Sequence, residues 1–174
     1  KSEPAIYLTE SERSTAPISG RYWLLLAGGK TDITLKHWSL TRYQQVVDEL
    51  QKHGVFCVQT GAVGRGHVHP SLQHVLNLVG WGGLRELFWQ IYHAQGVICP
   101  ITCAMHVAAA FQKPAVVLAG GREEPWWEAY SGHTFLHTLG QLDCCLQSGC
   151  WRNKLVDETA ARSCSHPVSR AADA

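Results

Sequence analysis

The sequence has almost no net charge, with 15 Lys and Arg residues against 14 Asp and Glu residues. Without a basic excess it has little to neutralise a polyphosphate backbone, so nucleic acid is not an expected partner. The sequence also has no apolar run of about 18 residues, the length that a transmembrane helix needs, and its first residues lack the layout of a signal peptide. These absences together predict a cytoplasmic protein.

Familiar catalytic motifs are missing too. The sequence contains no Walker loop, no G-x-G-x-x-G fingerprint and no Ser-His-Asp order. What remains is a chain of one-domain size, with 174 residues of which 45% are hydrophobic and 17% charged. That composition is apolar enough to close one packed core and too apolar for a disordered chain.

Apolar runs alternate with segments of helical periodicity along most of the chain. A capping-box pattern at Thr41 and Gln44 opens one expected helix, and two others follow. The expected strands are residues 22–29, 55–59, 96–101 and 114–121, and the expected helices begin at Thr41, Leu84 and Met105. This alternation predicts an α/β fold, a single Rossmann-like domain with a mostly parallel sheet.

The loops behind these strands are the expected ligand-binding edge, because ligands gather beyond the carboxyl ends of parallel strands. In the first loop, Gly28 and Gly29 permit close backbone approach, and Lys30 and Lys36 supply cations. Such a loop can hold a pyrophosphate. The alternative is a plain turn with solvated lysines, and the residues alone favour it.

A second candidate site follows the strand that ends near Pro100. Thr102 stands at an expected helix start, where free amides suit a phosphate, and His106 follows one turn later. The competing interpretation makes Thr102 only an N-cap and His106 a half-buried structural histidine. The residue types alone do not decide between these two interpretations.

Two further groups lie on the same edge. His67 and His69 have the spacing of a metal pair, but no nearby carboxylate or cysteine completes a site, which favours surface histidines beside a ligand cleft. Trp126 and Trp127 can stack on a base or a sugar, although packing over the sheet edge is favoured.

The seven cysteines fall into two groups. Cys57, Cys99 and Cys103 lie in apolar runs, which predicts buried, reduced thiols. The other four crowd into a short C-terminal segment, which favours a structural zinc or iron site, with free thiols and then disulfides as alternatives. These expected ligands are Cys144, Cys145, Cys150 and Cys164.

Two segments carry a resemblance to a known family. LAGGKTDITLKHW places Lys36 and Trp38 in a Lys-x-Trp element, and ITCAMHVAAAFQKP keeps Thr102, His106, an alanine run and a proline. In this order they resemble the C-terminal, donor-binding domain of glycosyltransferase family 9, the ADP-heptose:lipopolysaccharide heptosyltransferases. The resemblance covers residues 22–130, and the later cysteine-rich phrases look like a branch of that family with such an extension.

The resemblance implies the C-terminal half of a GT-B fold that binds an ADP-linked, heptose-like donor. Its donor-binding residues would be Gly28, Gly29, Lys36, Thr102, Cys103 and His106. Inverting transfer in the family needs no metal, and its catalytic base lies in the N-terminal domain. The acceptor would be a sugar or a lipid-linked sugar, at the inner membrane, and this chain alone would transfer little.

The expected organisation is therefore an arm at 1–20, a nucleotide-sugar-binding domain at 21–140 and a cysteine-rich tail at 141–174. Ile101 stands where the family has an aspartate, and Cys103 where it has a glycine. Loss of the aspartate favours one alternative, a nucleotide-binding module without transfer activity. A second alternative makes the cysteine tail a metal-binding or assembly element.

Overall fold

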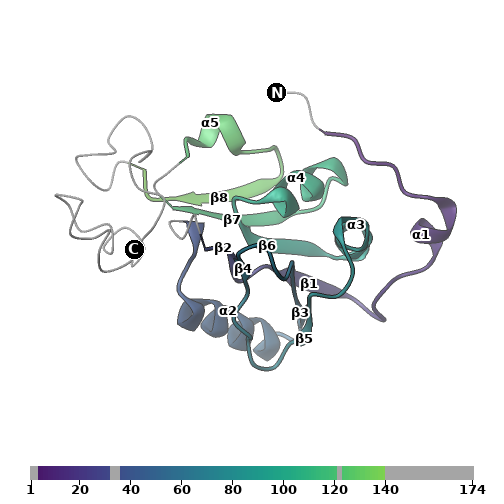
Figure 1. Ribbon diagram of the computed structural model, residues 1–174, viewed down its shortest axis with the longest axis horizontal. Helices are drawn as coiled ribbons and strands as arrows, with labels where there is room; N and C mark the ends of the chain where they lie inside the picture. Colours follow the sequence, from purple (N-terminus) through teal and green to yellow (C-terminus); the bar gives the residue numbers. More distant parts are fainter. Residues whose placement is uncertain (1–3, 32–35, 121–122, 140–174) are drawn as a thin grey trace.

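The computed structural model describes residues 4–31, 36–120 and 123–139. Its centre is a six-stranded sheet with the spatial order β5-β3-β1-β6-β7-β8 (Figure 1). The strands are β1 (Tyr22–Leu25), β3 (Phe56–Gly61), β5 (Leu76–Val79), β6 (Gly96–Pro100), β7 (Ala115–Gly120) and β8 (His133–His137). The mostly parallel α/β sheet predicted from the sequence is confirmed, since each neighbouring pair is parallel.

The strand order reverses at β1. Chain order runs outward from β1 to β3 and β5 on one side, then returns to β6 and continues to β7 and β8 on the other. In doubly wound sheets the loops at such a reversal diverge to opposite faces and leave a crevice at the carboxyl ends of the strands. The residues behind β1 and β6 therefore face one crevice.

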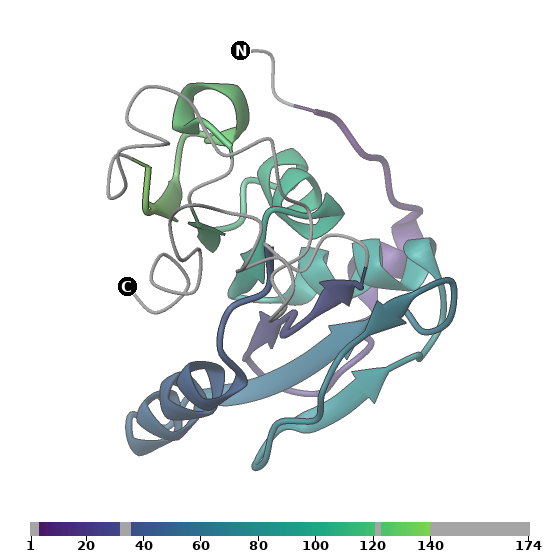
Figure 2. The same ribbon diagram turned by 60° about the vertical axis from the view of Figure 1, so that its left-hand side comes forward.

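Helices cover both faces of the sheet, with α3 and α4 opposite α2 (Figure 2). On one face, α3 (Leu84–His93) and α4 (Cys103–Ala110) bury Ile91 and Met105 against the strands. On the other, α2 (Leu40–Lys52) buries Tyr43 and Val47. Strands covered on both faces read as continuous apolar runs, which is why β1, β3, β6 and β7 were predictable.

The capping-box prediction for α2 is wrong. The helix begins at Leu40 with Ser39 as its N-cap, so Thr41 lies inside the first turn. Gln44 instead binds the loop beyond β3, since its Oε1 accepts a hydrogen bond from the Gln73 amide at 2.7 Å. The Gln44 side chain makes a tertiary hydrogen bond instead of a helix cap, and the local sequence pattern does not show this contact.

The edge strands β5 and β8 were not predicted, because polar residues interrupt both: Asn77 lies within LNLV, and HTFLH contains two histidines and a threonine. As edge strands they bury no residue fully and need no continuous apolar run. A short antiparallel pair, β2 (Gly29–Lys30) and β4 (His67–Val68), lies apart from the main sheet. It joins the loop after β1 to the loop after β3.

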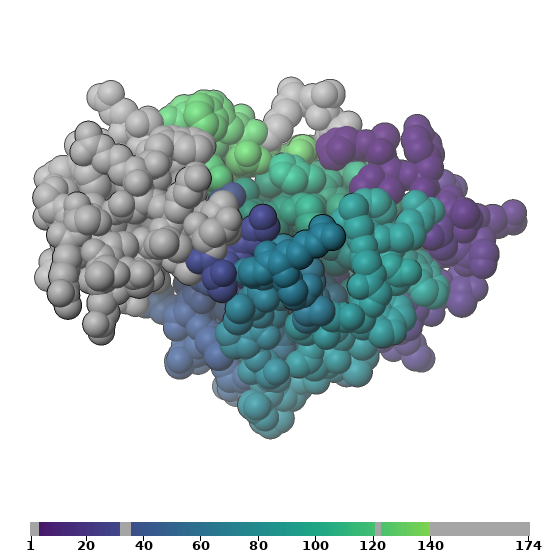
Figure 3. Space-filling model, in the orientation of Figure 1, coloured from purple at the N-terminus to yellow at the C-terminus, as the bar shows by residue number. Residues whose placement is uncertain are grey.

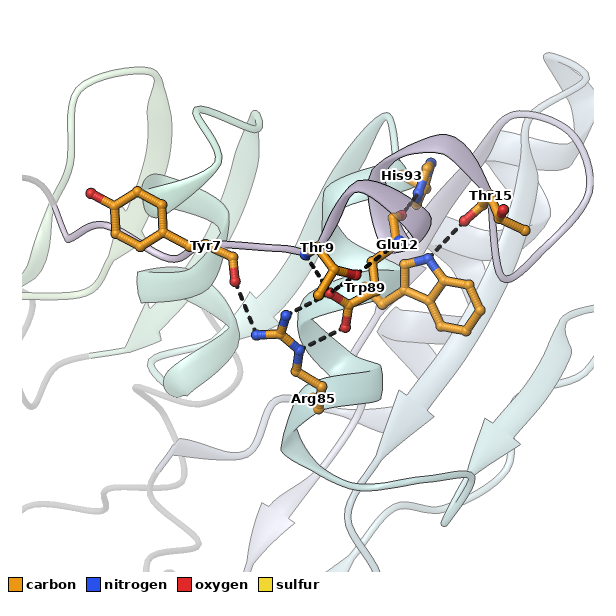
Figure 4. Close-up of polar contacts among 7 residues, drawn as sticks. All are labelled: Tyr7, Thr9, Glu12, Thr15, Arg85, Trp89 and His93. Atoms are coloured by element: carbon orange, nitrogen blue, oxygen red, sulfur yellow. Dashed lines mark hydrogen bonds and ion pairs between the residues drawn. The ribbon is translucent and has the colours of Figure 1, made fainter.

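The segment predicted as an arm contains a helix, α1 (Glu10–Ser14), with a complete capping box at Thr9 and Glu12. In the space-filling view this segment, in purple, lies on the side of the molecule where α3 is exposed (Figure 3). Polar contacts attach it to α3 (Figure 4). Arg85 Nε donates to Glu12 Oε1 at 2.7 Å, and Trp89 Nε1 donates to the Thr15 carbonyl at 2.8 Å.

Candidate functional site: a pocket at the carboxyl ends of the strands

A cavity of about 460 Å³ opens where β1, β3 and β6 end. Its volume is within the range of small-molecule sites. Three of the four predicted rim loops contribute to its wall, together with the segment that leads into α3. The lining residues are Leu26, Gly28, Gly29, Lys30, Lys36, His37, Thr60, Gly61, Ala62, His67, His69, Trp81, Gly82, Gly83, Leu84, Leu87, Pro100, Ile101, Thr102 and Cys103.

Lys36 connects the loop after β1 to the loop after β7. Its Nζ lies 2.8 Å from Oε1 of Glu123, which follows β7, and 3.5 Å from the Ile101 carbonyl oxygen. Glu123 is only 7% exposed. The lysine that the sequence singled out is therefore on the pocket wall, but a buried carboxylate already compensates its charge. The sequence shows Glu123 on the same edge without indicating this partnership.

The start of α4 forms another part of the wall. Thr102 is the N-cap of this helix, yet its side chain makes no capping hydrogen bond. Its Oγ1 is buried and has no hydrogen-bond partner among the described residues. Because the first amides of a helix lack intrahelical partners, this wall offers donors to an anion.

Of the three cysteines predicted to be buried, two are buried and one is exposed. Cys57 and Cys99 are buried as predicted, and burial raises the pKa of Cys99 to about 12. The prediction for Cys103 is wrong, because this residue is exposed at the pocket. It occupies the first position of α4, where the helix start turns it away from the core on which Ala104 and Met105 pack.

His106 lies one turn further along α4 and does not line the pocket. Its Nδ1 is 2.8 Å from the Tyr130 hydroxyl, and its Nε2 is 3.7 Å from Oε2 of Glu128. The structure therefore gathers Gly28, Gly29, Lys36, Thr102 and Cys103 around one cavity and places His106 outside its lining.

Three exposed tryptophans lie near this edge, two on α5 and one at the pocket. Trp126 and Trp127, on α5 (Pro125–Glu128), are 64% and 48% exposed, so the favoured packing interpretation is wrong. Trp81 lines the pocket and is 45% exposed. Leu84 also lines it and is 58% exposed. The helix begins at Leu84 as predicted, and this first residue lines the cavity.

Three histidines from the loops after β1 and β3 also line the cavity. His37, His67 and His69 all line the cavity, and burial lowers the pKa of His37 and of His69. Sequence reasoning placed His67 and His69 beside a cleft but did not single out His37, which stands inside the Lys-x-Trp element.

Within the described ranges, no group of three His, Cys, Asp or Glu residues is arranged to hold a metal ion. The predicted metal ligands Cys144, Cys145, Cys150 and Cys164 lie outside those ranges. Among the helices that the structure describes, none is long and apolar enough to cross a membrane.

Comparison with known proteins gives one family and several solved structures. The model of "Glycosyltransferase family 9 (heptosyltransferase)" matches residues 2–147. This span begins twenty residues earlier than the resemblance seen in the sequence, so it includes α1. No curated protein matches the chain in sequence.

Three similar structures show the same fold at low sequence identity. The iron-containing dodecameric glycosyltransferase TibC from enterotoxigenic E. coli H10407 is 18% identical, with a TM-score of 0.65 over 91% of this chain and 43% of TibC. E. coli ADP-heptose lps heptosyltransferase II is 20% identical, with a TM-score of 0.58 over 75% and 44%. A family 9 glycosyltransferase from Veillonella parvula DSM 2008 is 16% identical, with a TM-score of 0.63 over 98% and 54%. The chain thus spans about half of these proteins.

Proposed function

The chain belongs to glycosyltransferase family 9, and on that basis we propose that its pocket binds the nucleotide-sugar donor, an ADP-linked heptose or similar sugar, of an inverting glycosyltransferase. The observation that carries the proposal is the position of the cavity, at the strand-order reversal, with Lys36 and Thr102 on its wall. TibC, which shares the fold, has been crystallised in complex with ADP-D-β-D-heptose.

The residues on the wall suit a diphosphate leaving group. The first amides of α4 and the Thr102 hydroxyl would donate to phosphate oxygens, and Lys36 would add a cation. These donors stabilise negative charge as the sugar–phosphate bond breaks. Because Lys36 is held by Glu123, the lysine must share or exchange its partner when a diphosphate binds.

The remaining parts of the reaction belong to a second domain. We propose that an N-terminal GT-B domain supplies the catalytic base and binds the acceptor, a sugar or a lipid-linked sugar, at the cytoplasmic side of the inner membrane. Similar structures are about twice as long as this chain, which supports a two-domain enzyme. The chain alone is expected to bind donor and transfer little.

Calorimetric titration of the 174-residue chain with ADP tests the donor site. We expect ADP to bind more tightly than UDP or GDP, and Lys36→Ala to weaken ADP binding at least about tenfold, because the loss also leaves the Glu123 carboxylate to repel the anion. Lys52→Ala is the matched control, since Lys52 pairs with Glu49 at 2.9 Å on exposed α2. Equal binding of the three nucleotides, or an unchanged affinity in Lys36→Ala, would contradict the proposal.

A specific observation favours a binding module without transfer activity as the second candidate. Ile101 replaces the family aspartate, and its side chain is only 5% exposed in the core beside α4. No carboxylate can reach the donor sugar from this position. Donor binding without turnover, after a family N-terminal domain is supplied, would select this candidate. Turnover under the same conditions would reject it.

We also propose that the cysteine-rich tail holds a structural zinc or iron ion through Cys144, Cys145, Cys150 and Cys164. The number of thiols supports it, as does the iron content of TibC. Metal analysis of the purified chain should find about one ion per chain, which Cys150→Ala should lose while Cys57→Ala retains it. A metal-free protein would reject the tail site.

A further inference from the structure

Three histidines on one wall of the pocket have no role in the donor site described above. His67 lies on β4 opposite Lys30 of β2, and His69 follows two residues later. His37 approaches the same pair of strands, with its Nε2 3.3 Å from the position that a Cβ of Gly29 would occupy. The rings thus come from two loops that are far apart in the sequence.

Two glycines leave room for His69, because neither has a Cβ. A Cβ at Gly61 would overlap the His69 ring, and one at Gly28 would overlap the Val68 carbonyl and lie 2.9 Å from the His69 Cα. The buried side chain of Gln59 then fixes the chain just beyond the ring. Its Nε2 donates to the Pro70 carbonyl at 2.7 Å, and its Oε1 accepts from the Leu72 amide at 2.9 Å.

The ring nitrogens that this arrangement buries are not used within the described part of the protein. Neither His37 Nε2 nor His69 Nδ1 has a hydrogen-bond partner there, although both atoms are buried. Buried polar atoms are nearly always paired, and an unpaired one costs about 1–3 kcal/mol. Because both nitrogens of a protonated imidazole donate, two such atoms on the lining of one cavity suit a ligand that supplies acceptors to protonated rings.

The charged groups around the rings show which ligand fits. Lys30 and Lys36 line the same cavity from the first loop, and Cys103 lines it from α4. Lys36 is paired with Glu123, so its charge is already compensated. Among the residues that the structure describes, the lining contains no Asp or Glu, which leaves a nitrogen-rich wall suited to an anion.

Protonation adds a second property. Burial lowers the pKa of His69, and the neighbouring His67 and His37 lower it further by charge repulsion. Burial also lowers the pKa of His37, against a hydrogen bond to the Lys30 backbone. Both rings are therefore neutral at neutral pH in the empty pocket. A bound anion reverses the electrostatic cost of the imidazolium and favours proton uptake.

We propose that His37, His67 and His69 form a histidine wall that binds the diphosphate of the donor, and that His37 and His69 take up protons as it binds, so that binding tightens as the pH falls. This inference rests on the proposed donor site and adds its regulation by pH. The sign follows from linkage: a ligand that raises a histidine pKa binds better below the bound-state pKa than above it.

The test is calorimetric titration of the full chain with ADP-glucose at pH 7.5 and pH 5.5, in buffers of different ionisation enthalpy. ADP-glucose is the probe because its diphosphate is esterified at both ends, whereas a terminal phosphate has a pKa of about 6 and would titrate in the same range. We expect affinity to rise about three- to tenfold at the lower pH, with about one proton taken up. His69→Gln should remove most of this rise, and His53→Gln, at the exposed C-cap of α2 outside the pocket, should keep it.

A measurement on the unmodified chain covers the case in which His69→Gln fails to fold. Histidine ring resonances followed by NMR should show at least two pKa values that rise when ADP-glucose is added. Equal affinity at both pH values without proton uptake would overturn the histidine wall and leave the donor site standing. Absence of ADP and ADP-glucose binding at every pH would overturn the donor site, and the inference with it.

Discussion

At the residue scale, one buried amide organises the pocket. Gln59 is fully buried at the end of β3, in a position where an apolar residue would continue the strand pattern. Its two hydrogen bonds to Pro70 and Leu72 fold the loop back over the sheet edge. This buried side chain is therefore one of the contacts that hold the loop carrying His67 and His69.

Substitution Gln59→Leu tests this dependence. The change leaves the buried Leu72 amide without its partner and removes the donor to the Pro70 carbonyl, which we expect to cost about 1–3 kcal/mol in the free energy of unfolding. Gln44→Leu is a close control, because Gln44 makes the same pair of contacts to Gln73 at an exposed site. It should cost less than about 1 kcal/mol. Urea unfolding measures both, and equal losses would show that burial does not decide the effect.

The close approach of His69 to Gly61 gives a second prediction at this scale. Gly61→Ala would force the ring to move, which we expect to destabilise the protein by about 1–3 kcal/mol and to shift the His69 resonances. Gly83 also lines the pocket, but a Cβ there meets only Glu86 Oε2 at 3.6 Å. Gly83→Ala should therefore stay within about 0.5 kcal/mol of the parent protein. An unperturbed His69 in Gly61→Ala would contradict the prediction.

At the element scale, α1 is attached to α3 by polar contacts and buries no residue of its own. Arg85 binds Glu12 and the Tyr7 carbonyl, and His93 Nε2 lies 2.7 Å from the Glu12 carbonyl oxygen (Figure 4). A short helix without a buried face has little intrinsic stability, so these contacts determine whether the segment stays docked.

The docking of α1 should depend on pH. Hydrogen bonds from Arg85 and then from the Thr9 backbone lower the pKa of Glu12 from 4.5 to about 2. Because the folded pKa is depressed, the stabilisation is complete above pH 4.5 and is lost as the pH falls from 4.5 toward 2.

Hydrogen exchange of residues 9–15, corrected for intrinsic rates, measures this docking. At pH 7, Glu12→Gln should lose protection and resemble the unmodified protein at pH 3. Glu10→Gln, on the same helix, removes a carboxylate that does not bind Arg85 and should keep its protection. If Glu12→Gln exchanges like the unmodified protein at pH 7, the ion pair does not hold the arm.

At the scale of the whole molecule, the described part of the sheet ends with β8 at His137, and the described residues of both core clusters all precede that point. We therefore expect a chain of residues 1–139 to unfold as cooperatively as the full chain and to keep its ADP affinity. A chain that ends at residue 131 lacks β8, so the edge of β7 is exposed and Phe135 no longer packs against the core. This shorter chain should lose stability. Calorimetric unfolding compares the three. A large loss in 1–139 would show that the tail is part of the domain.

The fold and half of the site could be predicted because their signals are local. Strands buried on both faces need continuous apolar residues, so β1, β3, β6 and β7 are visible in the sequence, and their order fixes which loops share an edge. Gly28, Lys36 and Thr102 were selected on this basis, and the structure brings them to one cavity. The family match followed from the same segments.

The rest was decided only by tertiary structure, because it depends on contacts between distant residues. The pairing of Lys36 with Glu123, the use of Gln44 and Gln59 to hold loops, and the direction of His106 toward Tyr130 leave no periodic trace. A polar side chain reads the same in sequence whether it faces solvent, a backbone group or a ligand. Only the packed chain brings its partner within hydrogen-bond distance, which is why the histidine wall became visible with the fold.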